Sequence, residues 1–304
     1  MARQWISAGR RRTPAAGLFA LVAVLAPLAA RAAPDPAAAE RGAYIFDAAD
    51  CAGCHTDAKN NGPRLAGGRP LATPFGIFYA PNITPDKETG IGNWTLEGFR
   101  RALREGISDH GYYFPVFPYP SFTGMSDGDI ADLFAYLQTQ APVKQAAKRH
   151  AVGPPFSWRF LQLGWRALFF KPGPLQPVPG KDAAWNRGNY LANAVVHCGE
   201  CHTPRNLLGG LEQSRAYSGN PQGPDNQKVP NITADADTGI GKWTLEEIET
   251  VLKSGQTPGF DFVGSGMAEV VKGTAKLTDE DRRAIAIYVK SLPPIATPRP
   301  AKKQ

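Results

Sequence analysis

One five-residue pattern, C-x-x-C-H, occurs twice in this chain and constrains its fold more than any other feature. It reads Cys51-Ala-Gly-Cys54-His55 in the first copy and Cys198-Gly-Glu-Cys201-His202 in the second, and together the copies use all four cysteines. The pattern is typical of c-type haem attachment, in which two thiols join the vinyl groups of one haem and the histidine binds its iron. The sequence therefore predicts two covalently bound haem c groups.

Other uses of paired cysteines fit this pattern less well. Disulfides, redox dithiols and a zinc site are all built from cysteine pairs. None of them explains a histidine directly after both second cysteines. A single zinc site would also bring the pairs within roughly 15–20 residues of each other, whereas here they lie 147 residues apart.

The N-terminal residues resemble an export signal. A basic segment that ends at Arg12 precedes an apolar run, residues 15–30, and Ala30-Arg31-Ala32 resembles a cleavage site. The run is shorter than the ~20 residues that usually span a membrane. We therefore predict a signal peptide of residues 1–32 that is cleaved on export to the periplasm. An uncleaved anchor is the alternative, and the mature chain could associate with the periplasmic face of the inner membrane.

The net charge of +7 comes mostly from this segment. Residues 1–32 contain five arginines and no acid, so the mature chain keeps 29 basic and 27 acidic residues, a net charge of +2. Without a strongly basic mature chain, the composition gives no support for nucleic-acid binding.

The chain also repeats outside the cysteine motifs. Arg-Gly-x-Tyr precedes each motif, ending at Tyr44 and Tyr190, and Pro-Asn-Ile-Thr follows it, at residues 81–84 and 230–233. Thr-Gly-Ile-Gly-x-Trp-Thr-Leu then recurs around Trp94 and Trp243, which we interpret as core residues beside the haem. The repeats predict two copies of one domain, residues 37–142 and 183–295, with a linker at 143–182 and a tail at 296–304.

Each copy is predicted to be helical. Threonine caps with glutamate in the first turn indicate helices that begin near Thr95 and Thr244. The last helix of each copy begins with a near capping box, at residues 126–129 and 278–281, followed by an apolar stripe. Gly42 and Gly188 would allow close helix crossing, although an ordinary helix C-cap explains their spacing equally well. The fold class expected is all-α.

The linker is rich in proline and carries a short apolar and basic segment. A helix there would place five apolar side chains on one face, either packed between the two domains or forming a docking face for a partner subunit or the membrane surface. These side chains are Trp158, Leu161, Trp165, Leu168 and Phe169.

Over residues 37 to 295, the chain resembles the multihaem cytochrome c subunits of bacterial periplasmic dehydrogenases, such as those that oxidise alcohols or gluconate. The resemblance rests on both C-x-x-C-H motifs with their neighbours, the repeated loops, and Phe117-Pro118-Tyr119-Pro120 followed by Met125. It implies two tandem all-α class I cytochrome c domains that pass electrons from a dehydrogenase catalytic subunit to a quinone, an oxidase or a soluble cytochrome. The best-known members carry three haems, whereas this chain has motifs for two.

The iron ligands are predicted unequally in the two copies. His55 and His202 are the proximal ligands, because each directly follows its cysteine pair. Met267, in a glycine-rich loop ahead of the last helix, is the predicted distal ligand of the second haem. A thioether opposite a histidine raises the reduction potential of haem and suits electron transfer.

The distal ligand of the first haem stays open at this point. Met125 aligns with Leu277 of the second copy, and Phe117 lies closest to the position of Met267. Met125 is our first choice, while His110 and an open or water-bound iron are the alternatives. Phenylalanine cannot bind iron, and several triple-haem relatives carry methionine at the position of Phe117.

The function expected is therefore electron transfer without a catalytic site of its own. The alternative is a dihaem enzyme, either peroxidase-like or thiosulfate-oxidising, with an open or unusual first haem site. A thiosulfate enzyme with a cysteine ligand is disfavoured because no cysteine is spare.

Overall fold

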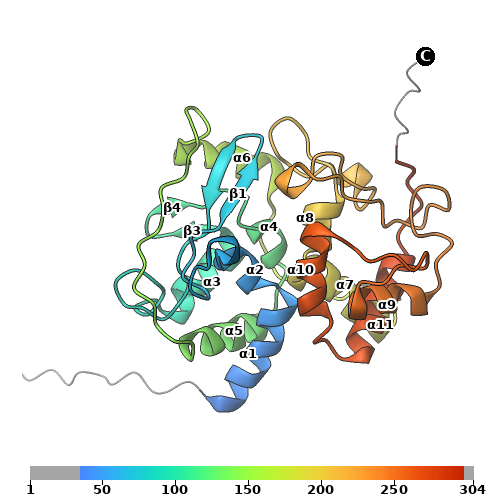
Figure 1. Cartoon of the computed structure of the whole chain (residues 1–304), viewed down its shortest axis with the longest axis horizontal. Coiled ribbons are helices and arrows are strands. Elements are labelled where there is room, and N and C mark those ends of the chain that lie inside the picture. The colour runs from blue at the N-terminus through green and yellow to red at the C-terminus, as the bar shows by residue number, and fades with distance from the viewer. Residues whose placement is uncertain (1–34, 298–304) are drawn as a thin grey trace, which may run out of the picture. The chain divides into compact units, whose positions relative to one another are not determined.

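Helices dominate the structure, in agreement with the expected fold class, and two small β-hairpins that were not predicted accompany them (Figure 1). This computed structural model describes residues 35–297, without the side chain of Ser265. The predicted signal peptide, residues 1–32, and most of the predicted tail, residues 296–304, lie outside the described residues. No helix within 35–297 is long and apolar enough to cross a membrane.

The first repeat begins and ends with helices that pack against each other, α1 and α5. Between them lie the first haem motif, two antiparallel hairpins and two further helices. The elements are α1 (Pro36–Ala48), α2 (Cys51–His55), a 3-10 turn (Ala58–Asn60), β1 (Pro70–Thr73), β2 (Gly76–Tyr79), α3 (Leu96–Glu105), β3 (Ile107–Ser108), β4 (Gly111–Tyr112), α4 (Tyr119–Phe122) and α5 (Asp127–Gln138).

The second repeat follows the same order, with α7 packed against α11. Among its described residues it has no strands in place of the hairpins β1–β2 and β3–β4, and α10 has ten residues where the first repeat has the four-residue α4. The elements are α7 (Ala183–Tyr190), a π-helical turn (Leu191–Val195), α8 (Cys198–His202), 3-10 turns (Gln213–Arg215 and Pro224–Asn226), α9 (Leu245–Ser254), α10 (Ser265–Thr274) and α11 (Asp279–Lys290).

The helix starts follow the predicted caps. The Thr95 hydroxyl accepts a hydrogen bond from the backbone N–H of Gly98, and Thr244 forms a complete capping box with Glu247. Ser126 and Thr278 cap the last helices through the N–H groups of the third helical residues. The apolar stripes lie in the core as expected: Ile130, Leu133, Phe134, Leu137, Ile285, Tyr288 and Val289 are buried.

The first and last helices of each repeat cross at a glycine. A Cβ on Gly42 would lie 1.9 Å from the carbonyl oxygen of Asp132, and one on Gly188 would lie 1.9 Å from that of Ala284. Both glycines lie inside helices, so the C-cap interpretation is wrong and the close crossing is confirmed. Any side chain at these positions would force the helices apart.

The Pro-Asn-Ile-Thr segments form buried turns that hold the chain following each last helix. The Asn82 amide donates to the carbonyl of Val143 at 2.7 Å, and its oxygen accepts from the backbone and hydroxyl of Thr84. Asn231 makes the same set of bonds, donating to Ile295 at 2.7 Å and accepting from Thr233. Because both asparagines are buried, these segments are structural turns.

The two repeats exchange equivalent hydrogen bonds. The Tyr44 hydroxyl donates to Asp281 at 2.6 Å and accepts from the N–H of Thr278. The Tyr190 hydroxyl likewise bonds to Asp129 and accepts from the N–H of Ser126. Each tyrosine therefore binds the capped start of the other repeat's last helix. This reciprocity supports the two-domain division, which remains a prediction, although the residues from Pro34 onward form one compact unit.

Asp281 should make stability depend on acid pH. Burial alone would raise the pKa of its carboxyl, but hydrogen bonds from Arg187 and Tyr44 outweigh burial and hold the pKa below its usual value. A carboxyl whose pKa is lower in the folded than in the unfolded state stabilises the fold at pH values above its unfolded-state pKa of ~3.9. That stabilisation is lost as the pH falls through the folded-state pKa. We expect Asp281→Asn to be less stable at pH 6 and to show a shallower loss of stability below pH ~4.

The measurement is denaturant unfolding from pH 6 down to pH 3. The control is Asp237→Asn, because Asp237 is exposed and pairs with Lys242 at 3.5 Å. This control should keep the wild-type pH profile. If the unfolding free energy of Asp281→Asn changed with pH in parallel to that of the wild type, the lowered pKa of Asp281 would be contradicted.

The linker packs against both repeats through one side of α6 (Gln162–Phe169). The Trp165 indole donates to the carbonyl of Leu208 at 2.9 Å, and Arg166 donates to the carbonyl of Glu105. The predicted single apolar face is divided: Trp165 and Phe169 are partly buried, while Trp158, Leu161 and Leu168 are exposed. A preceding 3-10 turn, Arg159–Leu161, interrupts the helical periodicity on which that expectation rested.

Candidate functional site

Each C-x-x-C-H motif forms one short helical turn, α2 or α8. A residue in the left-handed region precedes each turn, Asp50 and His197, both with φ of 48°. The sharp change of direction follows α1 in one repeat and the π-helical turn in the other. Because the cysteines are three positions apart in a helical turn, both thiols lie on the same side of it. The histidine follows immediately.

Both histidines are held by a proline carbonyl. Nδ1 of His55 lies 2.8 Å from the carbonyl oxygen of Pro81, and Nδ1 of His202 lies 2.8 Å from that of Pro230. A bond in which Nδ1–H donates to the carbonyl leaves Nε2 deprotonated, which is the form that binds a metal. Burial lowers the pKa of both imidazoles, which also favours the neutral form. Two thiols beside a neutral, oriented imidazole fit the donor set that haem c requires.

The thiols lack the environment of redox cysteines. Burial raises the pKa of Cys54 and Cys201 to about 11 and that of Cys198 to about 12. Reactive dithiols instead have a lowered pKa. All four cysteines are free, and within residues 35–297 no three histidine, cysteine or acidic side chains cluster as a metal-binding set. The arrangement therefore favours attachment over dithiol or zinc chemistry.

The second motif lies at the contact between the repeats. Glu200, inside the second motif, accepts a hydrogen bond from Ser121 of the first repeat at 2.7 Å and pairs with Arg205 at 2.6 Å. The attachment edge of the second site thus lies near this interface.

The candidate distal ligands occupy different environments. Met267 is the third residue of α10, partly buried against the core. Met125 is fully buried in the core, directly before the cap of α5. His110 is exposed in the turn between β3 and β4. Trp94 and Trp243 pack partly buried against the core.

Sequence reasoning missed two sets of contacts at the site. One is the pair of proline carbonyls that orient the histidines; the recurrence of Pro-Asn-Ile-Thr after both motifs was the available signal. The other is His197, whose ring lies 5.3 Å from that of Phe122 and whose Nε2 is 3.4 Å from the carbonyl oxygen of Ala49. No pattern in the sequence indicates the contacts of His197 with Phe122 and Ala49.

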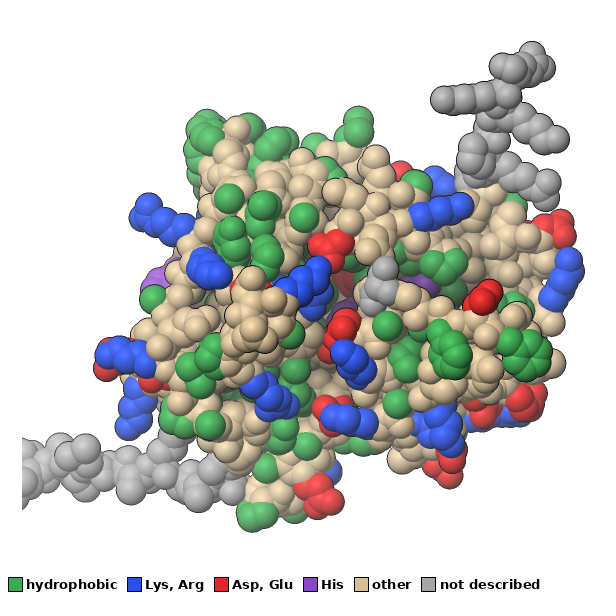
Figure 2. Space-filling view, in the orientation of Figure 1, with side chains coloured by type: hydrophobic (Ala, Val, Ile, Leu, Met, Phe, Trp, Pro, Cys, Tyr) green, Lys and Arg blue, Asp and Glu red, His purple; other side chains and the backbone are tan. Residues whose placement is uncertain are grey.

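A broad apolar face lies over the linker and includes residues that follow the second haem motif. Figure 2 shows hydrophobic side chains gathered at the upper left, where Figure 1 places α6 and β1. Phe75, at the hairpin tip, contacts Phe156 with ring centroids 5.0 Å apart, and Trp158 stacks on Phe160 at 5.9 Å. The face consists of Phe156, Trp158, Phe160, Leu161, Leu163, Leu168, Leu207 and Leu208, all exposed.

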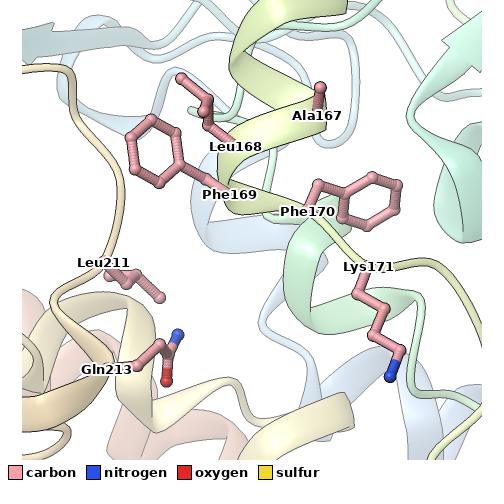
Figure 3. A pocket seen from close by; sticks show the side chains of 7 residues that line it. All are labelled: Ala167, Leu168, Phe169, Phe170, Lys171, Leu211 and Gln213. Atoms are coloured by element: carbon pink, nitrogen blue, oxygen red, sulfur yellow. The ribbon is translucent and has the colours of Figure 1, made fainter.

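A surface hollow adjoins this face between α6 and the segment that follows the second motif. It is lined by residues 167–171 with Leu211 and Gln213. Figure 3 shows Phe169 and Leu211 on opposite sides of the hollow, while Phe170 points away from Leu211. Phe170 contacts Tyr119 instead, at 4.9 Å between ring centroids. The hollow joins the linker to the second repeat, and the side chains that line it include the polar Lys171 and Gln213.

The sequence of this chain is similar to those of known proteins. The family model described as Cytochrome c matches residues 39–141. A protein of Cereibacter sphaeroides described as "Diheme cytochrome c-type" is 43% identical over 263 residues, covering 84% of this chain and 86% of the relative.

Longer relatives also match. A nicotinate dehydrogenase subunit of Pseudomonas putida is 42% identical over 83% of this chain and 21% of its own length. The cytochrome c subunit of the quinone-dependent alcohol dehydrogenase of Gluconobacter oxydans is 39% identical over 86% of this chain and 56% of its own length. The chain thus spans about half or less of these two relatives. They are dehydrogenase subunits, and none of the three supports the dihaem-enzyme alternative.

Proposed function

This chain belongs to the family of dihaem c-type cytochromes, and from that premise we propose that it relays electrons from a dehydrogenase catalytic subunit to a respiratory acceptor. The observation that carries the proposal is the paired arrangement of two C-x-x-C-H turns, each with its histidine bonded to a proline carbonyl. A quinone, an oxidase or a soluble cytochrome is the acceptor. The site of action is the periplasm, reached through the signal peptide of residues 1–32.

The residues divide the work of holding each haem. Cys51 and Cys54 would attach the first haem, and Cys198 and Cys201 the second. His55 and His202 would bind iron through Nε2, since Nδ1 is bonded to the proline carbonyl. Met267 would bind the iron of the second haem through its thioether. When bound, the haems supply one-electron Fe(III)/Fe(II) chemistry whose potential the axial ligands set.

The interface between the repeats supports transfer within the chain. Ser121 joins the repeats through Glu200 of the second motif. The reciprocal tyrosine bonds join the same two repeats at the starts of their last helices. These contacts hold the two attachment sites in one compact unit, which favours transfer between them.

The apolar face is the docking surface for the catalytic subunit. An exposed patch of this kind marks an interaction site in a soluble protein, and aromatic side chains are enriched in the buried centres of protein interfaces. The relatives are named as subunits of dehydrogenases, which favours a protein partner over a lipid surface. The face includes Leu207, which follows the second haem motif by five residues and is 96% exposed.

The test uses the full chain, tagged and produced in its own host. Intact mass should show two haems, and replacing Cys198 and Cys201 with alanine should remove one of them. The catalytic subunit should co-purify with the wild-type chain, so that the preparation has dehydrogenase activity. The substrate of that dehydrogenase should reduce the haems of this chain. A double variant, Phe160→Ser with Leu163→Ser, should keep both haems and lose the activity.

A control variant, Leu175→Ser, changes an exposed residue outside the defined face and should keep the activity. Absence of haem from the mature chain would overturn the proposed function. The docking assignment would be overturned if the double variant kept as much activity as the control variant. It would also be overturned if the double variant lost binding to anionic lipid vesicles and kept the dehydrogenase activity.

A further inference from the structure

The segment before the last helix of the second repeat, which carries Met267, can be compared with the equivalent segment of the first repeat. In each repeat a helix ends at a glycine in the left-handed region, Gly106 with φ 63° and Gly255 with φ 78°. The carbonyl of that glycine then accepts a backbone bond from Tyr113 at 2.8 Å or from Val263 at 2.9 Å. These two bonds give the segments that follow a common starting point, although the segment up to the cap of the last helix is two residues longer in the second repeat.

Four residues beyond this bond the two segments carry different side chains, in the first turn of α10 in the second repeat and just before α4 in the first. Counting from Val263 reaches Met267, and counting from Tyr113 reaches Phe117. Phe117 therefore occupies the position that supplies the distal thioether in the second repeat. Its ring lies 5.3 Å from that of Tyr113 and 5.8 Å from that of Phe122, and its own side chain, a hydrocarbon, has no atom that binds iron.

Met125 occupies the position of Leu277, not that of Met267. It immediately precedes the cap residue Ser126, as Leu277 immediately precedes Thr278. Its N–H donates to the carbonyl three residues earlier, Phe122, just as the N–H of Leu277 donates to Thr274. Met125 is 0% exposed and Leu277 is 3% exposed, both within the core. Met125 thus fills the leucine position, and withdrawing it would leave a cavity beneath the start of α5.

The described histidines are held elsewhere. His110 is exposed at the tip of the β3–β4 hairpin. His150 accepts a hydrogen bond from the N–H of Tyr79 through Nδ1 at 3.2 Å. His197 forms the left-handed turn before α8 and packs against Phe122. None lies in the loop that carries Phe117.

From this asymmetry we propose that the distal side of the first haem is open and binds small exogenous ligands. The ligand class is a neutral diatomic such as carbon monoxide on the reduced protein, and a small anion such as cyanide on the oxidised protein. The second repeat is closed to both by Met267. This inference rests on the proposed function for the presence of both haems, and it replaces Met125 as the expected ligand.

The experiment is carbon monoxide titration of the reduced full chain, on protein whose mass shows two haems. The Soret change should correspond to one haem of two. Phe117→Met should abolish carbon monoxide binding and double the long-wavelength charge-transfer band of thioether-bound ferric haem. Met125→Leu, which copies the second repeat, should leave both spectra unchanged.

The proposal would be overturned if the wild type bound no carbon monoxide, if both haems bound it equally, or if Met125→Leu lost a thioether band. It would also be overturned, in favour of His110 as the ligand, if His110→Ala bound carbon monoxide at the first haem and the wild type did not. Because all samples are first shown to carry two haems, a negative result would leave the proposed electron relay standing.

Discussion

Replacing Gly188 with alanine is expected to lower the free energy of unfolding by about 3 kcal/mol, at the upper end of overpacking effects. The new methyl carbon would lie 1.9 Å from the carbonyl oxygen of Ala284 and 2.9 Å from Cβ of Tyr288. The first of these atoms is backbone, so the clash is relieved only by moving α7 away from α11. Gly42→Ala should behave in the same way, because its methyl carbon would meet Asp132 at 1.9 Å and Tyr136 at 2.8 Å.

The measurement is guanidinium unfolding followed by far-ultraviolet circular dichroism. Gly128→Ala is the matched control, because Gly128 is also helical and its nearest neighbour would be the Ser126 hydroxyl at 3.8 Å. Alanine is favoured over glycine in helices by about 1 kcal/mol, so this control should be unchanged or slightly stabilised. If Gly188→Ala matched the control, the proposed close crossing would not exist in solution.

Asn82→Ala is expected to destabilise the first repeat by about 2–4 kcal/mol, since each buried polar group left unpaired costs about 1–3 kcal/mol. The substitution removes the donor to Val143 and the acceptor for both the N–H and the hydroxyl of Thr84. Thr84 is fully buried, so water cannot replace the lost partner. Asn231→Ala should have an equal effect through Ile295 and Thr233.

This second prediction also reaches the haem site. Asn82 directly follows Pro81, whose carbonyl orients His55, so a loosened turn should broaden the distribution of imidazole orientations. We expect the spectrum of the first haem to change in Asn82→Ala and that of the second to change in Asn231→Ala. Asn93→Ala is the control, because Asn93 is exposed and donates one bond to Lys87. Its loss of stability should stay below about 1 kcal/mol. Spectral change at the opposite haem would refute the local mechanism.

Much of the candidate site was predictable because its signals are local in sequence. The cysteines and histidine of each motif are five consecutive residues, so their chemistry is read without knowing the fold. Helix starts at Thr95, Thr244, Ser126 and Thr278 were also predictable, since a cap forms between residues three positions apart. The hairpins escaped prediction because β1 has only four residues and β3 only two, too few to show an alternating pattern.

The linker illustrates the opposite case. Its apolar residues predicted one continuous helical face, but the helix begins only at Gln162. Trp165 turns inward because its indole finds the Leu208 carbonyl on the second repeat. That contact depends on where the two repeats lie in space, and the spacing of residues within the linker carries no information about it.

The sequence by itself predicted two haem attachment sites, one in each copy of a repeated unit, because the signals for them lie in neighbouring residues and in their recurrence. Alignment of the two copies along the sequence also set Phe117 closest to Met267 and Met125 opposite Leu277. Tertiary structure added the backbone bonds onto Gly106 and Gly255 and the complete burial of Met125. These contacts depend on packing between segments distant in sequence, which spacing along the chain does not record.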